Sequence, residues 1–361
     1  MQEPSSPVFV IAEAGVNHNG DAELAVELVE AAIDSGADAV KFQTFQADLV
    51  VTKEAEKAEY QLRQDSSESQ WSMLKSLELP RPLHFQLKDL CDQVGIEFMS
   101  TAFDIDSLDF LVKEVGVKRL KVPSGEITNA PYLLDHAKTG LDCIVSTGMS
   151  SLAEVETALG VLAFGYIDSG EPPGSDAFQD AFRSPEGQQL LHKHVALLHC
   201  TTEYPVPYDC VNLRAMNTMR SAFDLSVGYS DHTLGTAVSL AAVACGACII
   251  EKHFTLDKNL PGPDHSASLM PDELTRMIAG IRAVEISLGH REKRPSAAEL
   301  KNIGIARRSL VASREIQKGE LLGPDNLVVK RPGTGINPMR YWEICGRPAS
   351  RYYLADELIE E

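Results

Sequence analysis

Long apolar runs are missing from this sequence. The longest, residues 237–250, is shorter than the ~18 residues that a membrane-spanning helix needs. Residues 1–7 are polar and precede only a few apolar residues, so no secretory signal peptide is expected. Both absences predict a soluble, cytoplasmic protein that does not insert into a membrane.

Positive charge is also scarce, since 33 Lys and Arg face 52 Asp and Glu, for a net charge of −19. This balance argues against nucleic acid or an anionic membrane as a partner, and leaves small molecules as the expected ligands. Residues 291–361 differ, with 13 bases and 10 acids. A mildly basic tail is therefore expected to rest against an acidic body, its own or a partner's.

Cysteine offers no disulfide framework, because the seven cysteines are odd in number and scattered, which suits a reducing cytosol. Cys245 and Cys248 lie in an apolar, Ala-rich run, where core packing is the expected use. A His-x-His motif after the first expected strand, found in many barrel hydrolases, is absent.

What the sequence does contain is a repeated alternation of strand and helix patterns. Eight short apolar runs read as strands at 8–13, 39–43, 97–101, 119–124, 143–147, 195–201, 225–230 and 248–253. Amphipathic stretches read as helices at 21–35, 81–94, 107–115, 130–139, 151–164, 212–222, 234–245 and 271–288. This order predicts a (β/α)₈ TIM barrel.

Two connections in this pattern are long, 47–80 and 165–193. The second is rich in Gly, Pro, Ser and acids, so most of it is expected to be surface loop. We expect a catalytic barrel over residues 1–288 and a charged linker over 289–302. Short β-type runs and turn signals then predict a separate small domain over 303–361.

Polar residues end the expected strands, and in a TIM barrel the chemistry lies at these carboxyl ends. They are Glu13, Lys41, Gln43, Thr101, Lys121, Ser124, Ser146, Thr202, Ser230, Asp231, His232, Glu251 and His253. Lys41 and Lys121, with the hydroxyls, predict a site for a small phosphate or carboxylate. The alternative is that the lysines pair with Glu13, Glu126 or Glu251 in a structural network.

His232 and His253 end neighbouring strands, which predicts half of a site for Mn²⁺ or a similar Lewis-acid ion. The alternative is that each is an ordinary hydrogen-bonded histidine. Glu13 and Glu126 are candidates for proton transfer. Asp264, in PGPDH, could bind sugar hydroxyls or be a turn aspartate.

Nine motifs in one order then identify a family: IAEAGVNHNG, VKFQTF, STAFD, KVPSGE, STGM, HCTTEYP, GYSDHT, EKHFTLD with PGPDH, and VKRPGTGI. Together they resemble the phosphoenolpyruvate-dependent nonulosonate synthases, which include N-acetylneuraminate, legionaminic and pseudaminic acid synthases. The likeness runs from about residue 8 to 358.

The resemblance implies roles residue by residue. The implied phosphoenolpyruvate contacts are Lys41, Thr101, Lys121, Ser124, Ser146 and Ser230. The implied contacts to the amino sugar are Glu13, Gln43, Phe103, Thr202, Tyr204, Asp264 and Arg331. His232 and His253 would be ligands of Mn²⁺, with Mg²⁺ or Co²⁺ as alternatives, and Glu126 would handle protons, with Lys121 also catalytic.

The resemblance also implies an antifreeze-like (SAF) C-terminal domain that is swapped onto the partner barrel of a homodimer, where Arg331 would reach the other sugar site. The expected reaction joins phosphoenolpyruvate, an open-chain N-acylated amino sugar and water, and releases phosphate by C–O cleavage. N-acetylmannosamine is favoured as the commonest substrate of the family. A 2,4-diacetamido-2,4,6-trideoxy hexose is the alternative.

One departure concerns the sugar: some sialic acid synthases have Asn near the N-acyl group where this chain has Thr202. Two further functions remain open. One is an aldolase in which Lys121 forms a Schiff base. The other is a carbohydrate-binding protein without turnover.

Overall fold

The computed structural model describes residues 7–57 and 69–361 of the chain. It divides into two compact units, Met1–Gly289 and His290–Glu361, which are described separately below. The predicted polar start at residues 1–6, and residues 58–68 of the first long connection, lie outside the described residues.

The first unit is built on one sheet of parallel strands in the order β3-β2-β1-β8-β7-β6-β5-β4. The two ends of this order, β3 and β4, are in contact, so the sheet curls into a barrel. The predicted TIM barrel is therefore confirmed. The strands are β1 Phe9–Gly15, β2 Ala39–Thr44, β3 Glu97–Ala102, β4 Arg119–Val122, β5 Asp142–Ser146, β6 Val195–His199, β7 Ser226–Asp231 and β8 Ile249–His253.

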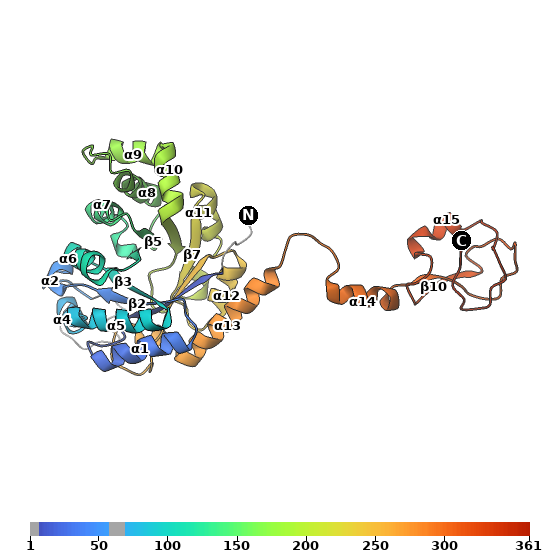
Figure 1. Cartoon of the computed structure of the whole chain (residues 1–361), viewed down its shortest axis with the longest axis horizontal. Coiled ribbons are helices and arrows are strands. Elements are labelled where there is room, and N and C mark those ends of the chain that lie inside the picture. Colours follow the sequence, from blue (N-terminus) through green and yellow to red (C-terminus); the bar gives the residue numbers. More distant parts are fainter. Residues whose placement is uncertain (1–6, 58–68) are drawn as a thin grey trace. The chain divides into compact units, whose positions relative to one another are not determined.

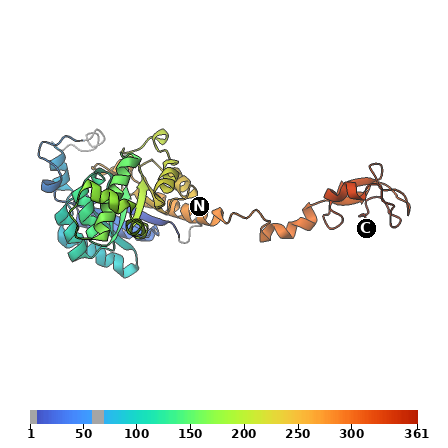
Figure 2. The same cartoon turned by 90° about the horizontal axis from the view of Figure 1, so that it is seen from above.

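Helices surround these strands (Figures 1 and 2). Asp21 caps the first of them by accepting from the N–H groups of Glu23 and Leu24. The helices are α1 Ala22–Asp34, α5 Arg81–Val94, α6 Ile105–Phe110 continued by a π-turn Leu111–Val115, α7 Ala130–Lys138, α8 Leu152–Ile167, α11 Ala215–Phe223, α12 Ala237–Ala244 and α13 Pro271–Leu288.

The barrel interior has an apolar layer below a polar one. Ile11, Ala39, Met99, Ile144, Leu198 and Ile249 form the apolar layer. Side chains alternate between the two faces of a strand, so the next inward positions lie two residues on. Those positions hold Glu13, Lys41, Thr101, Ser146, Cys200 and Glu251, all of them buried. The strand period thus gathers polar groups at the carboxyl ends.

The expected loop at 165–193 is wrong, because helices fill most of it. Two additional helices, α9 Ser175–Arg183 and α10 Pro185–His194, lie outside α8 (Figure 1). The ring of Phe178 packs edge-on against Phe164, 5.2 Å between centroids, and Ser184 caps α10. The Gly, Pro and acid signals belong only to the short turn before α9.

The connection after β2 contains two short helices, α2 Ala47–Val50 and α4 Gln70–Ser76. Within the described residues, no helix has the length and apolarity that crossing a membrane demands. The expected core packing of Cys245 is wrong, since it is exposed at the end of α12 and Cys248 is half-buried. The apolar run ends there because Gly246 turns the chain with φ +89°.

The second unit has its own small core, formed by Leu310, Ala312, Ile316, Leu322, Leu327, Ile344, Ala349, Tyr353 and Ile359. An antiparallel pair, β9 Ser309–Ala312 and β10 Leu327–Lys330, lies over it, followed by α15 Tyr341–Ile344. Helix α14, Ala297–Ala306, spans the end of the predicted linker and the start of the predicted domain. Its N-terminus is fixed by a capping box between Ser296 and Glu299.

Candidate active site

A cavity of about 290 Å³ opens at the carboxyl ends of the barrel strands. Fourteen of the residues predicted for phosphoenolpyruvate, sugar and metal line it: Glu13, Lys41, Gln43, Thr101, Phe103, Lys121, Ser124, Ser146, Thr202, Tyr204, Ser230, His232, His253 and Asp264. These residues are distant in sequence and come from all eight strands or the turns after them. The structure therefore brings nearly the whole predicted site together.

Lys41 lies at the base of this cavity between two carboxylates. Its ammonium is 2.6 Å from Glu13 and 3.6 Å from Glu251, and it donates to the Thr101 hydroxyl at 3.0 Å. Burial would lower the pKa of Lys41, but Glu13 and Glu251 outweigh it and raise the pKa. Lys41 is therefore held as a cation in a site shielded from water.

Lys121 shares Glu251 with Lys41. Its ammonium is 3.3 Å from Glu251 Oε1, which also accepts from the Ser230 hydroxyl at 2.9 Å. Burial would raise the pKa of Glu251, but Lys121 and Lys41 outweigh it and hold the pKa well below its usual value. Glu251 is thus firmly ionised. The lysines do pair with Glu13 and Glu251, as the alternative interpretation had it, but Glu126 is not among these partners.

Glu13 behaves differently from Glu251. Burial and the charge of Glu251 raise its pKa to about 7, against the opposing effect of Lys41. Near neutral pH, two ammonium groups therefore face one fully ionised carboxylate and one that is partly protonated. The base of the cavity keeps residual positive charge, which an anionic ligand would neutralise.

The rings of His232 and His253 lie 5.7 Å apart between centroids. His232 Nδ1 donates to the Thr201 carbonyl at 2.8 Å, which leaves the lone pair on Nε2. Among the residues described, His253 Nδ1 has no hydrogen-bond partner although it is buried, and Asp264 Oδ2 is 3.9 Å away. Burial lowers the pKa of His232 to about 4 and that of His253 well below its usual value.

Two neutral, convergent imidazoles fit a divalent cation, because metal binding requires free nitrogen lone pairs. Over residues 7–57 and 69–361, no three His, Cys, Asp or Glu side chains gather as a complete metal site. Water or substrate oxygens would have to complete the coordination.

Hydroxyl groups border the cavity where β5 meets β4. The Ser124 hydroxyl accepts from the Gly148 N–H at 3.0 Å. A Cβ at residue 148 would lie 2.5 Å from Thr202 Oγ1 and 2.7 Å from Ser124 Oγ, so only glycine fits. In the described part of the chain, the buried Thr202 hydroxyl has no hydrogen-bond partner, and it can therefore serve a ligand.

An apolar wall closes another side of the cavity. It comes from the connection after β2 and neighbouring turns and consists of Val16, Phe45, Val50, Met73, Leu74, Leu77 and Phe103, which pack into one cluster. Of these residues only Phe103 was predicted from the sequence, because short helices α2 and α4 lie in a segment that was read as a long connection. Apart from Gln70 of α4, which also lines the cavity, this side offers mainly hydrocarbon.

One predicted residue of the first unit, Glu126, does not line this cavity. Glu126 is half-buried in the turn after β4, where it accepts from Asn129 at 2.7 Å, although its neighbours Ser124 and Gly125 line the cavity. Arg331 belongs to the second unit, where it donates to the Ala306 carbonyl. Glu251 was predicted at a strand end and as a partner of the lysines but was given no ligand-binding role, and the structure places its carboxylate between Lys41 and Lys121.

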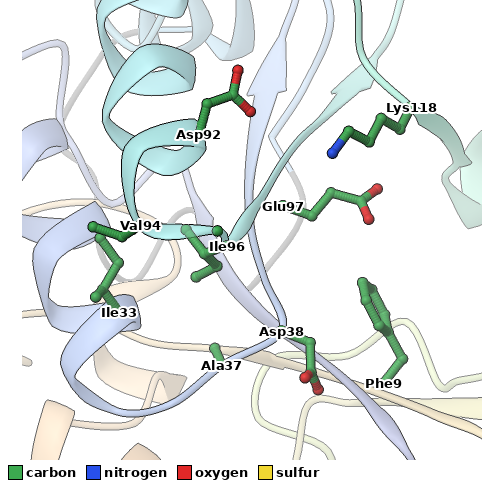
Figure 3. A pocket seen from close by; sticks show the side chains of 10 residues that line it. Phe9, Ile33, Ala37, Asp38, Asp92, Val94, Ile96, Glu97 and Lys118 are labelled. Carbon is green, nitrogen blue, oxygen red and sulfur yellow. The ribbon is translucent and has the colours of Figure 1, made fainter. Parts of the chain in front are cut away.

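A second pocket, of about 430 Å³, lies at the opposite end of the barrel, at the amino ends of β1, β2 and β3 (Figure 3). Its acids have structural partners: Asp38 pairs with Arg282 at 2.8 Å and Glu97 with Arg119 at 2.7 Å. In a TIM barrel this end contributes stability, whereas chemistry lies at the other.

Comparison with known proteins agrees with this geometry. Residues 28–293 match the NeuB family and residues 307–361 match the SAF domain. N,N'-diacetyllegionaminic acid synthase of Campylobacter jejuni is 49% identical over 98% of this chain and 99% of its own length. The enzyme of that name from Legionella pneumophila is 50% identical over 95% of this chain and 90% of its own.

A solved structure is also similar, that of N-acetylneuraminic acid synthetase from Leptospira borgpetersenii. It has a TM-score of 0.66 and 34% identity, and the match covers 82% of this chain and 90% of that one. The SAF match confirms the nature of the predicted C-terminal domain. The chain belongs to the NeuB family of synthases and carries a SAF domain at its C-terminal end.

Proposed function

We propose that this enzyme condenses phosphoenolpyruvate with an open-chain 2,4-diacetamido-2,4,6-trideoxy hexose and water, giving a legionaminic-type nonulosonic acid and phosphate. One observation carries the proposal. Two buried lysines, Lys41 and Lys121, share the ionised carboxylate of Glu251 at the base of a cavity that also holds two neutral imidazoles. A small anion and an aldehyde can meet there.

Phosphoenolpyruvate fits the lysine side of the cavity. Its phosphate and carboxylate would neutralise the charge that Glu251 leaves uncompensated, and the hydroxyls of Thr101, Ser124, Ser146 and Ser230 supply donors. Holding both anionic groups fixes the enol carbon in one place, which lowers the entropy cost of carbon–carbon bond formation.

His232 and His253 would hold a divalent cation, for which Mn²⁺ is favoured. When bound, such an ion supplies Lewis-acid polarisation of an aldehyde oxygen. Thr201 contributes by accepting from His232 Nδ1, which fixes the tautomer and the ring direction.

The proposed reaction begins when C3 of phosphoenolpyruvate attacks the aldehyde carbon of the sugar. The new C–C bond leaves positive character at C2, water adds there and loses a proton, and phosphate departs with its bridging oxygen. Lys41 and Lys121 hold the anionic groups throughout. Glu13 lines the cavity and Glu126 follows two lining residues, so these two carboxyls are the candidates for the proton transfers.

The choice of sugar differs from the N-acetylmannosamine favoured by sequence, which becomes the second candidate. Two relatives at 49% and 50% identity are legionaminic acid synthases, whereas the sialic acid synthetase is 34% identical. The apolar wall supports the same choice, because the methyl group of a 6-deoxy sugar suits hydrocarbon better than a hydroxymethyl group does.

The second unit is proposed to act from a second copy of the chain in a cytoplasmic, domain-swapped homodimer, in which Arg331 reaches the sugar site of the partner. The opposite charge balances of residues 291–361 and the rest of the chain support such an arrangement.

The function is tested by measuring phosphate release from phosphoenolpyruvate with each sugar in the presence of Mn²⁺. We expect turnover with the diacetamido trideoxy sugar and at least tenfold lower kcat/KM, on the order of 1–3 kcal/mol, with N-acetylmannosamine. Phosphoenolpyruvate labelled with ¹⁸O in its bridging oxygen should yield labelled phosphate. Borohydride trapping of Lys121 with pyruvate would support the Schiff-base aldolase instead. No turnover with either sugar would support the carbohydrate-binding protein.

A further inference from the structure

The two residues that precede the candidate metal ligands form a buried ion pair. Asp231 precedes His232 at the end of β7, and Lys252 precedes His253 at the end of β8. Asp231 and Lys252 are paired across the two strands, and the ammonium lies 3.0 Å from Asp231 Oδ2. Their side chains are 0% and 1% exposed. Because successive side chains alternate, this pair and the imidazoles lie on opposite faces of the sheet.

The pair also fixes the residue that follows His232. Asp231 Oδ1 accepts from both the N–H and the hydroxyl of Thr233, each at 2.8 Å, and Lys252 donates to the Thr233 carbonyl. Asp231 Oδ2 accepts from Ser239 of α12 at 2.6 Å. The backbone is therefore held on both sides of His232 by groups that reach β8 and α12.

The ring and carbonyl of His232 are fixed separately. The Thr201 carbonyl accepts from Nδ1 at 2.8 Å, and the His232 carbonyl accepts from the Val206 N–H at 3.0 Å. Rotation of the ring is thus limited by the segment that follows β6, while Asp231 and Lys252 help to set the position of the His232 backbone relative to β8.

Stability alone is a weak explanation for this pair. Taking two charges out of water is costly, and apolar residues of similar volume are often at least as stabilising as a buried ion pair. Asp231 and Lys252 can pair in only one register of β7 against β8, whereas apolar side chains could pack in several. The ion pair therefore favours one alignment of the two strands. That register sets the distance between the two imidazoles.

We propose that Asp231 and Lys252 are positioning residues that hold His232 and His253 at the separation a shared divalent cation requires. The inference rests on the proposed function, in which these histidines bind the metal. It assigns a role in metal affinity to two side chains that neither touch the cavity nor face the substrate.

The test compares Mn²⁺ affinity, measured from the electron paramagnetic resonance of free Mn²⁺, in the full-length wild type and a double variant, Asp231→Asn with Lys252→Met. The double variant removes both charges, so neither is left buried alone, and Asn keeps an acceptor for Thr233. We expect the Kd for Mn²⁺ to rise by about 10- to 100-fold, as for other residues that orient metal ligands.

The matched control is Glu97→Gln with Arg119→Met, which removes the ion pair at the amino end of the same barrel. It should leave the Kd for Mn²⁺ unchanged. If the double variant at 231 and 252 does not fold, Thr233→Val provides the test, because it deletes one hydrogen bond to Asp231 at constant shape and should weaken Mn²⁺ binding measurably.

The outcomes separate the two levels of the proposal. If the wild type binds Mn²⁺ and the folded variants bind it equally well, the positioning role is wrong while the proposed function stands. If the wild type binds no divalent cation, the metal site itself is wrong, and the positioning role fails with it.

Discussion

Lys121 and Glu251 come from strands on opposite sides of the barrel, β4 and β8, yet their charged groups lie 3.3 Å apart. Glu251 spans the interior to reach this ammonium and also lies 3.6 Å from Lys41. Glu251 therefore links the two lysines across the base of the cavity. An anion that binds above them meets charges that are already fixed, so little reorganisation is needed on binding.

Replacing Lys121 by Met should strongly reduce the catalytic efficiency with phosphoenolpyruvate. The change removes one of two cations and leaves Glu251 more negative toward the ligand. We expect kcat/KM for phosphoenolpyruvate to fall at least about 100-fold, or roughly 3 kcal/mol. Lys118→Met is the matched control, because Lys118 is exposed at the amino end of the same barrel (Figure 3). Equal losses in both variants would contradict an anion site at Lys121.

Glu126→Gln tests the proton role of a residue that does not line the cavity. If this carboxylate moves a proton during turnover, kcat should fall by about 10²–10⁴ with little change in KM for phosphoenolpyruvate. Tm should hardly move, because the structure gives Glu126 a half-exposed position and a hydrogen bond from Asn129. Asn129→Ala, which removes that hydrogen bond, is the control. A decrease in kcat of less than tenfold in Glu126→Gln would contradict the proton-transfer role of Glu126 and leave Glu13 as the candidate.

The choice of sugar can be tested at Met73 in the apolar wall. Met73→Gln keeps the shape of the side chain but adds an amide that can hydrogen-bond a hydroxymethyl group. The ratio of kcat/KM for the trideoxy sugar over N-acetylmannosamine should fall by about tenfold, the value of one methyl contact. Met277→Gln, an equally buried change in α13 away from the cavity, should lower stability and leave the ratio unchanged. An unchanged ratio in Met73→Gln would show that the wall does not select the sugar.

Strand period explains why so much of the site could be predicted from sequence. Lys41, Thr101, Ser146 and Glu251 occupy inward positions whose direction follows once the strands are located, and a parallel barrel brings all carboxyl ends to one rim. Strand periodicity cannot say what each residue does. The expected roles came from the order of the nine motifs, which resembles that of the nonulosonate synthases.

Long-range geometry explains what could not be predicted. Whether Lys41 and Lys121 pair with Glu13, Glu126 or Glu251 depends on side chains crossing the barrel interior, and strand order does not set their reach. Helices α9 and α10 were missed because the turn residues before them dominate the composition of the segment. Their apolar contacts, such as Phe178 with Phe164, are tertiary and leave only a weak periodic signal.

A last prediction concerns acid sensitivity and uses a histidine far from the metal ligands. His136 in α7 is fully buried, its Nδ1 bonds to the Tyr132 carbonyl, and burial lowers its pKa to about 4. The folded protein therefore resists protonation of His136, whereas the unfolded chain takes up that proton near pH 6.5. The stability contribution is complete above pH 6.5 and is lost as pH falls toward 4.

His136→Gln should remove this dependence, so the free energy of unfolding of the wild type should fall by about 2 kcal/mol more than that of the variant between pH 7.5 and 5. Urea unfolding followed by far-UV circular dichroism measures the difference, and His290→Gln, at an exposed position, should behave as the wild type does. Parallel pH profiles for wild type and His136→Gln would mean that this imidazole is solvated, or already protonated, in the folded barrel.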